Sequence, residues 1–370
     1  MSHVIPLVDL AAQHAALQHA LDAAIARVLA SGRFILDAEV SAFERAFAAH
    51  LGVGHAVGVS SGTAALQLAL LAVGVGSGDE VITVSHTASA TVAAIVSVGA
   101  VPVFVDIDAA RYTLDPDQLA AAFSRRTRAI IPVHLYGCPA DLTPILAFAR
   151  EHGLRVIEDC AQAHGARYNG RAVGTWGDLG AFSFYPTKNL GAMGDGGAVV
   201  TSDPALAARV TELRQYGWRR RYVSEAHGLN ARLDELQAAI LAVKLVHLDG
   251  WNVRRRALAR QYSAALTRTD LGLPIEPPGT THVFHQFVVR TAQRDALAAH
   301  LERHRIASAI LYPVPVHLQP AFSAARRPVA LDHTERAADT VLSLPLYSEL
   351  TDAQQAQVCV AITTWDGLRQ

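Results

Sequence analysis

The most informative stretch of this chain is Ala181-Phe-Ser-Phe-Tyr-Pro-Thr-Lys188-Asn-Leu-Gly-Ala-Met-Gly-Asp-Gly-Gly197. An apolar, aromatic strand runs into a turn, the turn presents Lys188, and a loop rich in glycine follows. Because such a turn is partly shielded from water, a lysine there can lose its proton and act as an amine nucleophile or Schiff-base partner. A lone loop lysine is more often a solvated surface residue, so the neighbouring sequence has to decide between the two interpretations.

A carboxylate follows a hydrophobic strand in the stretch Arg155-Val-Ile-Glu-Asp159-Cys-Ala-Gln162. A lysine that binds an aldehyde and an aspartate that pairs with a pyridinium nitrogen are the two fixed points of a pyridoxal phosphate (PLP) site. Asp159 could instead be a solvated carboxylate or a metal ligand, whereas Glu158 points to the other side of the pleat and is expected to be structural. Taken with Lys188, Asp159 favours a PLP site.

Continuous apolar strands alternate with helical segments through most of the chain. This alternation predicts an α/β fold with a large, mostly parallel, seven-stranded sheet covered by helices on both faces. Such sheets bind ligands at the C-terminal ends of their strands, where Asp159 and Lys188 are expected. The expected strands are His55–Val59, Glu80–Val84, Val101–Val105, Ala129–Leu135, Arg155–Glu158, Ala181–Phe184 and Ala198–Thr201, and the expected helices include Leu10–Ala30, Ala88–Val98 and Pro116–Phe123.

The pattern changes after about residue 245. Val246–Leu266 has the spacing of one long basic helix, a proline-rich turn follows, and strands such as Ala309–Tyr312 then mix with helices. We therefore predict a large PLP-binding α/β domain over residues 1–245 and a smaller C-terminal α+β domain over residues 246–370. A chain of 370 residues is long enough for both.

The composition and charge argue against several classes of protein. A hydrophobic content of 51% argues against disorder, and a formal net charge of −1 gives no electrostatic reason to bind nucleic acid or an anionic membrane. The N-terminus shows no secretory signal pattern, and no uncharged apolar run is long enough to span a membrane. Cys138, Cys160 and Cys359 lack metal-type spacing, so we expect reduced thiols, a cytoplasmic location and no metal site.

Other stretches could contact a flat, phosphorylated cofactor or its substrate. Ser60-Ser-Gly-Thr63 joins a strand to a helix, where backbone N–H groups suit a phosphate, although an ordinary N-cap uses the same residue types. His86 follows a strand end and could stack on a flat ring or be an ordinary loop histidine. Gln162 lies one turn beyond Asp159 and could bond to the ring hydroxyl. The patch Arg219-Arg-Arg-Tyr222 suits a diphosphate or is a solvated loop.

With these stretches in place, the chain resembles the DegT/DnrJ/EryC1/StrS family of sugar aminotransferases, PLP enzymes of fold type I. The resemblance runs nearly end to end and rests on long motifs in the family's order. These motifs are Ser31-Gly-Arg-Phe-Ile-Leu36, Ser60-Ser-Gly-Thr-Ala-Ala-Leu66, Gly78-Asp-Glu-Val81, Pro132-Val-His-Leu-Tyr-Gly137, Glu158-Asp-Cys-Ala-Gln-Ala-His-Gly165, Phe182-Ser-Phe-Tyr-Pro-Thr-Lys-Asn-Leu-Gly191 and Gly228-Leu-Asn-Ala-Arg-Leu-Asp-Glu-Leu-Gln-Ala-Ala239.

The resemblance implies a role for each matching residue. Lys188 would hold PLP as a Schiff base, Asp159 would pair with the pyridine nitrogen, and Gln162 would reach the ring oxygen. His86 stands where the family places a ring over the PLP face.

The family also implies where the cofactor phosphate binds. Gly62, Thr63 and Ser183 would hold it within one subunit. Asn230 would reach the phosphate of the neighbouring subunit's cofactor, so the resemblance implies a homodimer with shared active sites.

The implied reaction is transamination, in which PLP cycles through pyridoxamine phosphate. The amino group comes from L-glutamate in most of the family and is then delivered to a ketone. Sister enzymes that act as sugar 3-dehydratases carry histidine at the position of Lys188, so the lysine favours an aminotransferase. Lys188 would be the general base and acid that moves a proton between the substrate carbon and the cofactor carbon.

The residues after Asn230 narrow the substrate. Ala231 and the pair Asp234-Glu235 resemble the 3-ketosugar branch more than relatives that act on 4-ketosugars. We expect a dTDP-linked 3-keto-6-deoxyhexose as the nucleotide-linked substrate, which gives a 3-amino sugar. The substrate-side candidates are Tyr185, Arg219, Arg220, Arg221, Tyr222 and His317.

Three alternatives stay open at this point. A 4-ketosugar or cyclitol aminotransferase of the same family is the nearest. A nicotinamide oxidoreductase would share the α/β architecture, but the chain lacks the G-x-G-x-x-G fingerprint after a first strand. A non-catalytic regulator with the PLP fold would need loss of the lysine or an added DNA-binding segment, and the sequence shows neither.

Overall fold

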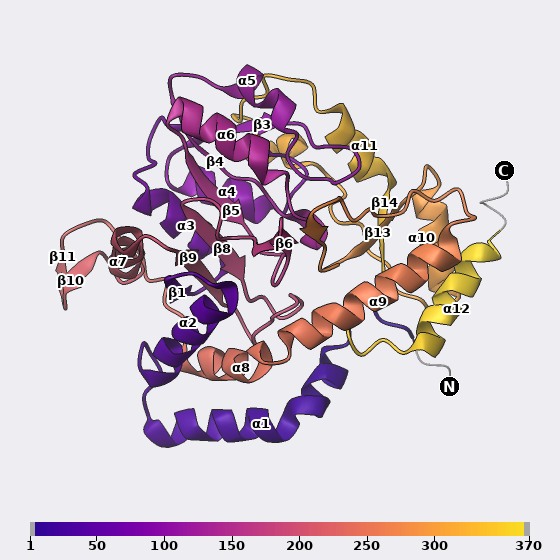
Figure 1. The fold of residues 1–370 in the computed structure, drawn as a ribbon, viewed down its shortest axis with the longest axis horizontal. Helices are drawn as coiled ribbons and strands as arrows, with labels where there is room; N and C mark the ends of the chain where they lie inside the picture. Colours follow the sequence, from indigo (N-terminus) through magenta and orange to yellow (C-terminus); the bar gives the residue numbers. More distant parts are fainter. Residues whose placement is uncertain (1–3, 366–370) are drawn as a thin grey trace.

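A seven-stranded sheet forms the centre of the structure, a computed structural model that describes residues 4–365 (Figure 1). The strand order is β1-β9-β8-β5-β4-β2-β3, and only β9 is antiparallel to its neighbours. The predicted mostly parallel sheet of seven strands is therefore confirmed. Its strands are β1 (His55–Val59), β2 (Glu80–Val84), β3 (Val101–Val105), β4 (Thr127–Ile130), β5 (Arg155–Asp159), β8 (Leu179–Ser183) and β9 (Gly197–Thr201).

Helices cover both faces of this sheet, which explains why β2 is buried along its whole length. Side chains of β8 alternate between the two cores, Ala181 packing on one side and Phe182 on the other. One core is covered by α3 (Gly62–Ala72), α4 (Ser89–Ser97) and α7 (Pro204–Leu213). The opposite face is covered by α2 (Ala38–Leu51), α6 (Leu142–His152), α8 (Glu235–Leu245) and α5 (Leu119–Ala122), which follows η1 (Pro116–Gln118), and α1 (Leu10–Ser31) packs against α8.

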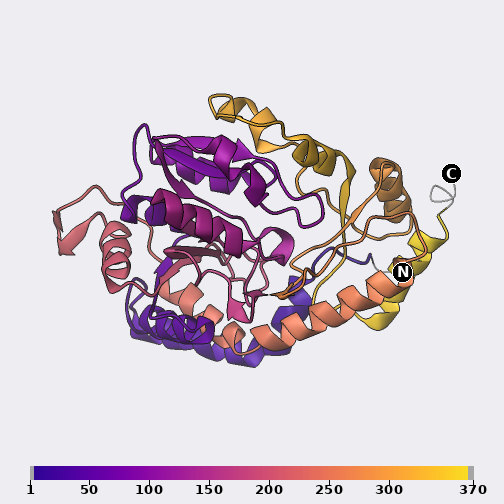
Figure 2. The same cartoon turned by 45° about the horizontal axis from the view of Figure 1, so that its top comes forward.

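The long helix α9 (Leu248–Leu266) leads from the sheet to the C-terminal part of the chain (Figures 1 and 2). A separate apolar core forms there around Tyr262 and Phe287. Ile5 joins this core and pairs with Ile306. The remaining elements of this part are β13 (Phe287–Arg290), α10 (Arg294–Arg303), η3 (Val316–Leu318), η4 (Pro320–Phe322), α11 (Asp332–Thr340), β14 (Val341–Leu344) and α12 (Asp352–Thr363).

Short strands connect these parts. β12 (Thr280–Thr281) pairs with β6 (Arg167–Tyr168), which pairs with β7 (Arg171–Ala172), so the chain after α9 lies against the segment after β5. A hairpin of β10 (Trp218–Arg220) and β11 (Val223–Ser224) projects beside α7, at the opposite end of the molecule from α10 and α12 (Figures 1 and 2). Within residues 4–365, no helix has the length and apolar character needed to cross a membrane.

Two expected strands differ from the structure. The strand expected over Ala129–Leu135 is regular only as far as Ile130. Beyond Pro132, which has no N–H to donate, one bridge from Val133 to Asp159 still pairs the segment with β5, and the chain then turns into η2 (Leu135–Gly137). The strand expected over Ala309–Tyr312 is wrong: in the described structure only Ala309 pairs, through one bridge to Ser343.

Candidate active site

The carboxyl ends of β1, β2, β5 and β8 meet at one edge of the sheet, because these strands are parallel to one another. The residues that follow these ends are the β1–α3 turn at residues 60–63, His86, Asp159 and Lys188. The topology therefore gathers, from distant parts of the sequence, the residues predicted to bind one cofactor.

Lys188 lies in a tight turn after β8. Its backbone N–H donates to the carbonyl oxygen of Tyr185 at 2.9 Å. Burial lowers the pKa of the Lys188 amine to about 8, although the nearby Asp159 carboxylate acts in the opposite direction. A larger fraction of the amine is therefore neutral near pH 7 than for an ordinary lysine, as a nucleophile or a proton acceptor requires.

Asp159 ends β5 with a side chain that is almost fully buried. Its Oδ2 accepts a hydrogen bond from Thr91 Oγ1 at 2.8 Å, and its Oδ1 accepts one from the N–H of Ala161 at 3.1 Å. Burial raises the pKa of Asp159, while these two bonds and Lys188 partly offset the rise. A buried carboxylate of this kind gains from a cationic N–H partner, which is what a protonated ring nitrogen offers.

His86 lies past the end of β2, fully buried beside two tyrosine rings. Its Nε2 is 2.9 Å from the hydroxyl oxygen of Tyr136, while its Nδ1 has no hydrogen-bond partner among the described residues. Burial lowers the pKa of His86 to about 4, so the ring is neutral at pH 7. A neutral aromatic ring of this kind can stack on the face of a flat cofactor.

Gln162 connects Tyr136, the hydrogen-bond partner of His86, to the C-terminal part of the chain. Its Oε1 accepts from the N–H of Tyr136 at 2.7 Å, and its Nε2 donates to the hydroxyl of Tyr312 at 3.0 Å. The Tyr136 hydroxyl donates in turn to the carbonyl of Leu311. Sequence reasoning assigned no role to Tyr136 or Tyr312. Tyr136 lay within a recognised motif, but its left-handed backbone (φ 58°) and the contact with Tyr312 depend on tertiary structure.

The β1–α3 turn touches the end of β8 closely. Ser61 caps α3 by accepting from the N–H of Ala64 at 3.1 Å, and a Cβ atom on Gly62 would lie only 2.6 Å from Ser183 Cβ. Only glycine therefore allows this approach without a shift. The first N–H groups of α3, with Thr63 and the Ser183 hydroxyl beside them, form a cradle suited to an anion such as a phosphate.

The candidates on the β10–β11 hairpin have other partners, whereas the segment at Asn230 does lie against the β1–α3 turn: the carbonyl of Ala231 accepts from the N–H of Ser60 at 3.2 Å. Arg219 pairs with Glu212 at 3.3 Å and with Glu225 at 3.4 Å. Asn230 is exposed and pairs through its backbone with Gln215. The other candidates on this hairpin, Arg220, Arg221 and Tyr222, are exposed as well. Tyr185, by contrast, is exposed directly beside the turn that carries Lys188.

His317 is buried, and both nitrogens of its ring have side-chain partners. Its Nδ1 is 2.7 Å from Ser85 Oγ, and its Nε2 is 3.1 Å from Glu335 Oε1. Both ring nitrogens are therefore engaged, which does not favour the substrate contact predicted for this residue. Since Ser85 precedes His86, these bonds connect His317 to the position of His86 instead.

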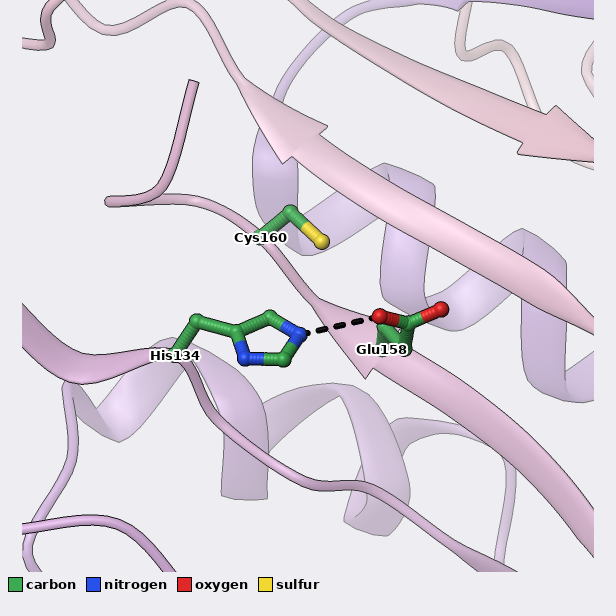
Figure 3. Close-up of side chains that lie close together, drawn as sticks. All are labelled: His134, Glu158 and Cys160. Atoms are coloured by element: carbon green, nitrogen blue, oxygen red, sulfur yellow. Dashed lines mark hydrogen bonds and ion pairs between the residues drawn. The ribbon is translucent and has the colours of Figure 1, made fainter. Parts of the chain in front are cut away.

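His134, Glu158 and Cys160 form a buried cluster with the residue types of a metal site (Figure 3). The Nδ1 of His134 accepts from the N–H of Ala140 at 3.0 Å, so its Nε2 carries the proton and donates to Glu158 Oε2 at 3.0 Å (Figure 3). Glu158 also accepts from the backbone N–H groups of Gly174, Trp176 and Gly177. Burial raises the pKa of the Cys160 thiol, which disfavours the thiolate that binds metals. These bonds give the cluster a structural role.

The strand-end lysine and carboxylate, with an anion cradle beside them, define a PLP-dependent enzyme that acts on amino groups. The chain belongs to the DegT/DnrJ/EryC1/StrS aminotransferase family, whose model matches residues 16–363. The protein is therefore a PLP-dependent aminotransferase.

Individual relatives cover nearly the whole chain. The chain is 50% identical to dTDP-3-amino-3,4,6-trideoxy-alpha-D-glucose transaminase of Streptomyces venezuelae, over 98% of this chain and 96% of that protein. It is 48% identical to UDP-N-acetyl-3-dehydro-alpha-D-glucosamine 3-aminotransferase of Acidithiobacillus ferrooxidans, over 97% of each chain. The crystal structure of S. venezuelae DesV in complex with a ketimine intermediate matches with a TM-score of 0.96, at 50% identity, and covers 98% of this chain and 99% of that chain.

Proposed function

We propose that this enzyme transfers an amino group from L-glutamate to the keto carbon of a nucleotide-linked ketosugar. The first candidate is a dTDP-linked 3-keto-6-deoxyhexose, which would give a 3-amino sugar. The observation that carries this proposal is that two relatives near half identity are both named for position 3 of a nucleotide-linked sugar. Their names differ in the nucleotide, dTDP or UDP, so they support amination at C3 more strongly than a particular nucleotide.

The proposed roles of Lys188 and Asp159 follow from their surroundings. PLP, when bound, supplies an electron-withdrawing ring that stabilises the electron pair left on carbon when a proton departs. Asp159, held by Thr91 and Ala161, would keep the ring nitrogen protonated. Lys188 would bind the cofactor and, once displaced by the incoming amine, would accept the proton at Nζ and return it to the neighbouring carbon.

The remaining cofactor contacts are proposed in the same way. His86 would stack on the ring as a neutral imidazole, and Gln162 would donate to the ring oxygen with the second hydrogen of the amide that already bonds Tyr312. Gly62, Thr63 and Ser183 would hold the phosphate at the start of α3. Asn230 of the partner subunit would complete this phosphate site in a homodimer.

Substrate contacts are proposed for exposed residues. Tyr185 is exposed in the turn that carries Lys188, where its side chain would contact the sugar. In a homodimer, Arg219, Arg220, Arg221 and Tyr222 of the exposed β10–β11 hairpin would contact the diphosphate bound in the partner subunit's site. We also propose a cytoplasmic location, supported by three free cysteines.

The test compares keto substrates with the purified enzyme. With PLP and L-glutamate present, we expect 2-oxoglutarate and an amino sugar from the dTDP-linked 3-keto-6-deoxyhexose, detected by mass spectrometry. The kcat/KM should exceed that for the 4-keto isomer by about tenfold or more, because a misplaced carbonyl loses its alignment with Lys188. Faster turnover of the 4-keto isomer would contradict amination at C3, and turnover of neither sugar would contradict the substrate class.

A further inference from the structure

The turn that carries Lys188 is fixed in place by the side chain of the next residue, Asn189, which is buried. Its Nδ2 donates to Asn252 Oδ1 in α9 at 2.9 Å and to the carbonyl of Val283 at 3.2 Å. Its Oδ1 is 3.2 Å from His285 Nδ1. Both hydrogens of the amide and its oxygen are therefore used, and all three partners lie in the C-terminal part of the chain.

Asn252 extends this network to the other side of the cofactor site. Its Nδ2 donates to the backbone carbonyl of His164 at 2.8 Å, in the segment that follows Asp159. Gly165 allows this approach: its φ is +84°, and a Cβ atom there would lie 2.5 Å from Asn252 Nδ2. Two buried amides thus connect the turn after β8 to the segment after β5.

The orientation of these amides is fixed by their partners. Turning the Asn189 amide over would place its oxygen against the carbonyl of Val283, where two acceptors would face each other. In the same way, turning Asn252 over would place its oxygen against the His164 carbonyl. His285 must therefore donate from Nδ1 to Asn189. The network has one self-consistent arrangement, and a network of that kind specifies geometry as well as stability.

The network carries no charge of its own near pH 7. Burial lowers the pKa of His285 well below its usual value, and Lys188, Arg255 and His164, which face it, act in the same direction. Burial also lowers the pKa of His164 to about 3. The Lys188 turn is therefore held by neutral groups, and these groups do not titrate in the range where Lys188 itself does.

We propose that Asn189 and Asn252 are positioning residues that set where the Lys188 amine lies relative to Asp159. The inference rests on the proposed role of Lys188 in binding PLP. Its basis is that Asn189 is bonded through the backbone to Lys188, while Asn252 is bonded both to Asn189 and to the segment after Asp159. Loss of either amide frees the turn on one side and moves the amine from its reactive position.

The experiment compares Asn189→Ala and Asn252→Ala with Gln355→Ala as a matched control. Gln355 is also a buried amide that bonds to α9, donating to the carbonyl of Leu258 at 2.6 Å, but it lies in the C-terminal core away from the Lys188 turn. For each apoprotein, PLP is added and the rate at which the visible band of lysine-bound PLP appears is measured. The midpoint pH of that band and the thermal unfolding temperature are measured on the same samples.

We expect both asparagine variants to attach PLP about tenfold more slowly or worse and to shift the midpoint pH of the band. Gln355→Ala should lower only the unfolding temperature. If the asparagine variants lose stability but keep the wild-type rate and midpoint pH, their role is structural and the inference is wrong. If Asn189→Ala does not fold, Asn252→Ala decides, because it leaves the bonds of Asn189 to Val283 and His285 in place. A wild-type protein that forms no band would instead contradict the proposed role of Lys188.

Discussion

At the scale of single residues, the reactivity of this site depends on how burial shifts the pKa values of its ionisable side chains. Lys188, Asp159 and His86 all have pKa values shifted mainly by burial, and each shift favours the neutral form. Shifts of this kind gather where a protein performs chemistry. For Asp159 the shift would be reversed once a cationic ring nitrogen lies beside it, because an opposite charge favours the carboxylate.

The pKa of Lys188 gives a pH prediction. Only the neutral amine attacks an aldehyde, so the rate of PLP attachment to the apoprotein should rise with pH and level off above about 8. The measurement is the growth of the visible band after rapid mixing, from about pH 6 to about pH 10.5, a range that includes both the shifted pKa of about 8 and the ordinary lysine pKa. Lys188→Ala should form no band at any pH. A wild-type rate that still increases near pH 10 would show that the amine has an ordinary pKa.

At the scale of secondary-structure elements, the start of α3 depends on one glycine. Gly62→Ala would place a methyl group against Ser183, since the Cβ atom would lie 2.6 Å from Ser183 Cβ. We expect the variant to lose about 1–3 kcal/mol of unfolding free energy, as overpacked sites do, and to bind PLP more weakly because the cradle widens. Denaturant unfolding and PLP titration measure the two effects.

A matched glycine provides the control for this prediction. A Cβ atom on Gly76 would meet nothing within 4 Å among residues 4–365, and its φ is not in the left-handed region. Gly76→Ala should therefore leave PLP affinity unchanged and be neutral or slightly stabilising. If the two variants behave alike, close packing between the β1–α3 turn and β8 is not what holds the cradle.

The sequence predicted elements well where local pattern decides them. The periodic helix at Leu10 and the buried strands β1, β2 and β3 appear where expected, because apolar spacing alone determines them. The expected strand Ala129–Leu135 is shorter in the structure: it is regular to Ile130, and beyond Pro132 only one bridge, from Val133 to Asp159, continues the pairing. Tyr312, Asn252 and His285 could not be predicted as neighbours of the site, since they come from the C-terminal part and only the packing of α9 brings them there.

At the scale of the whole molecule, the surface around Asn230 supports the proposed homodimer. Asn230 and the β10–β11 hairpin are exposed, and aromatic side chains are exposed beside them, with Tyr222 72% and Tyr216 37% accessible. Phe34 and Ile35 are exposed as well, at 45% and 47%, in a segment whose backbone bonds to Asp234 and Glu235. Exposed apolar groups gathered near a polar candidate favour a contact with a second copy of the chain.

Subunit complementation tests this proposal. Lys188→Ala and Asn230→Ala chains with different tags are co-expressed, and the heterodimer is purified through both tags. If Asn230 serves the partner's site, one of the two sites has both residues intact, so the heterodimer should recover about half of the wild-type specific activity. If Asn230 serves its own subunit, both sites carry a defect and activity stays near the level of the two homodimers. Recovery through both tags separates these outcomes from a failure to assemble, because a monomer carries one tag and is retained on only one of the two columns.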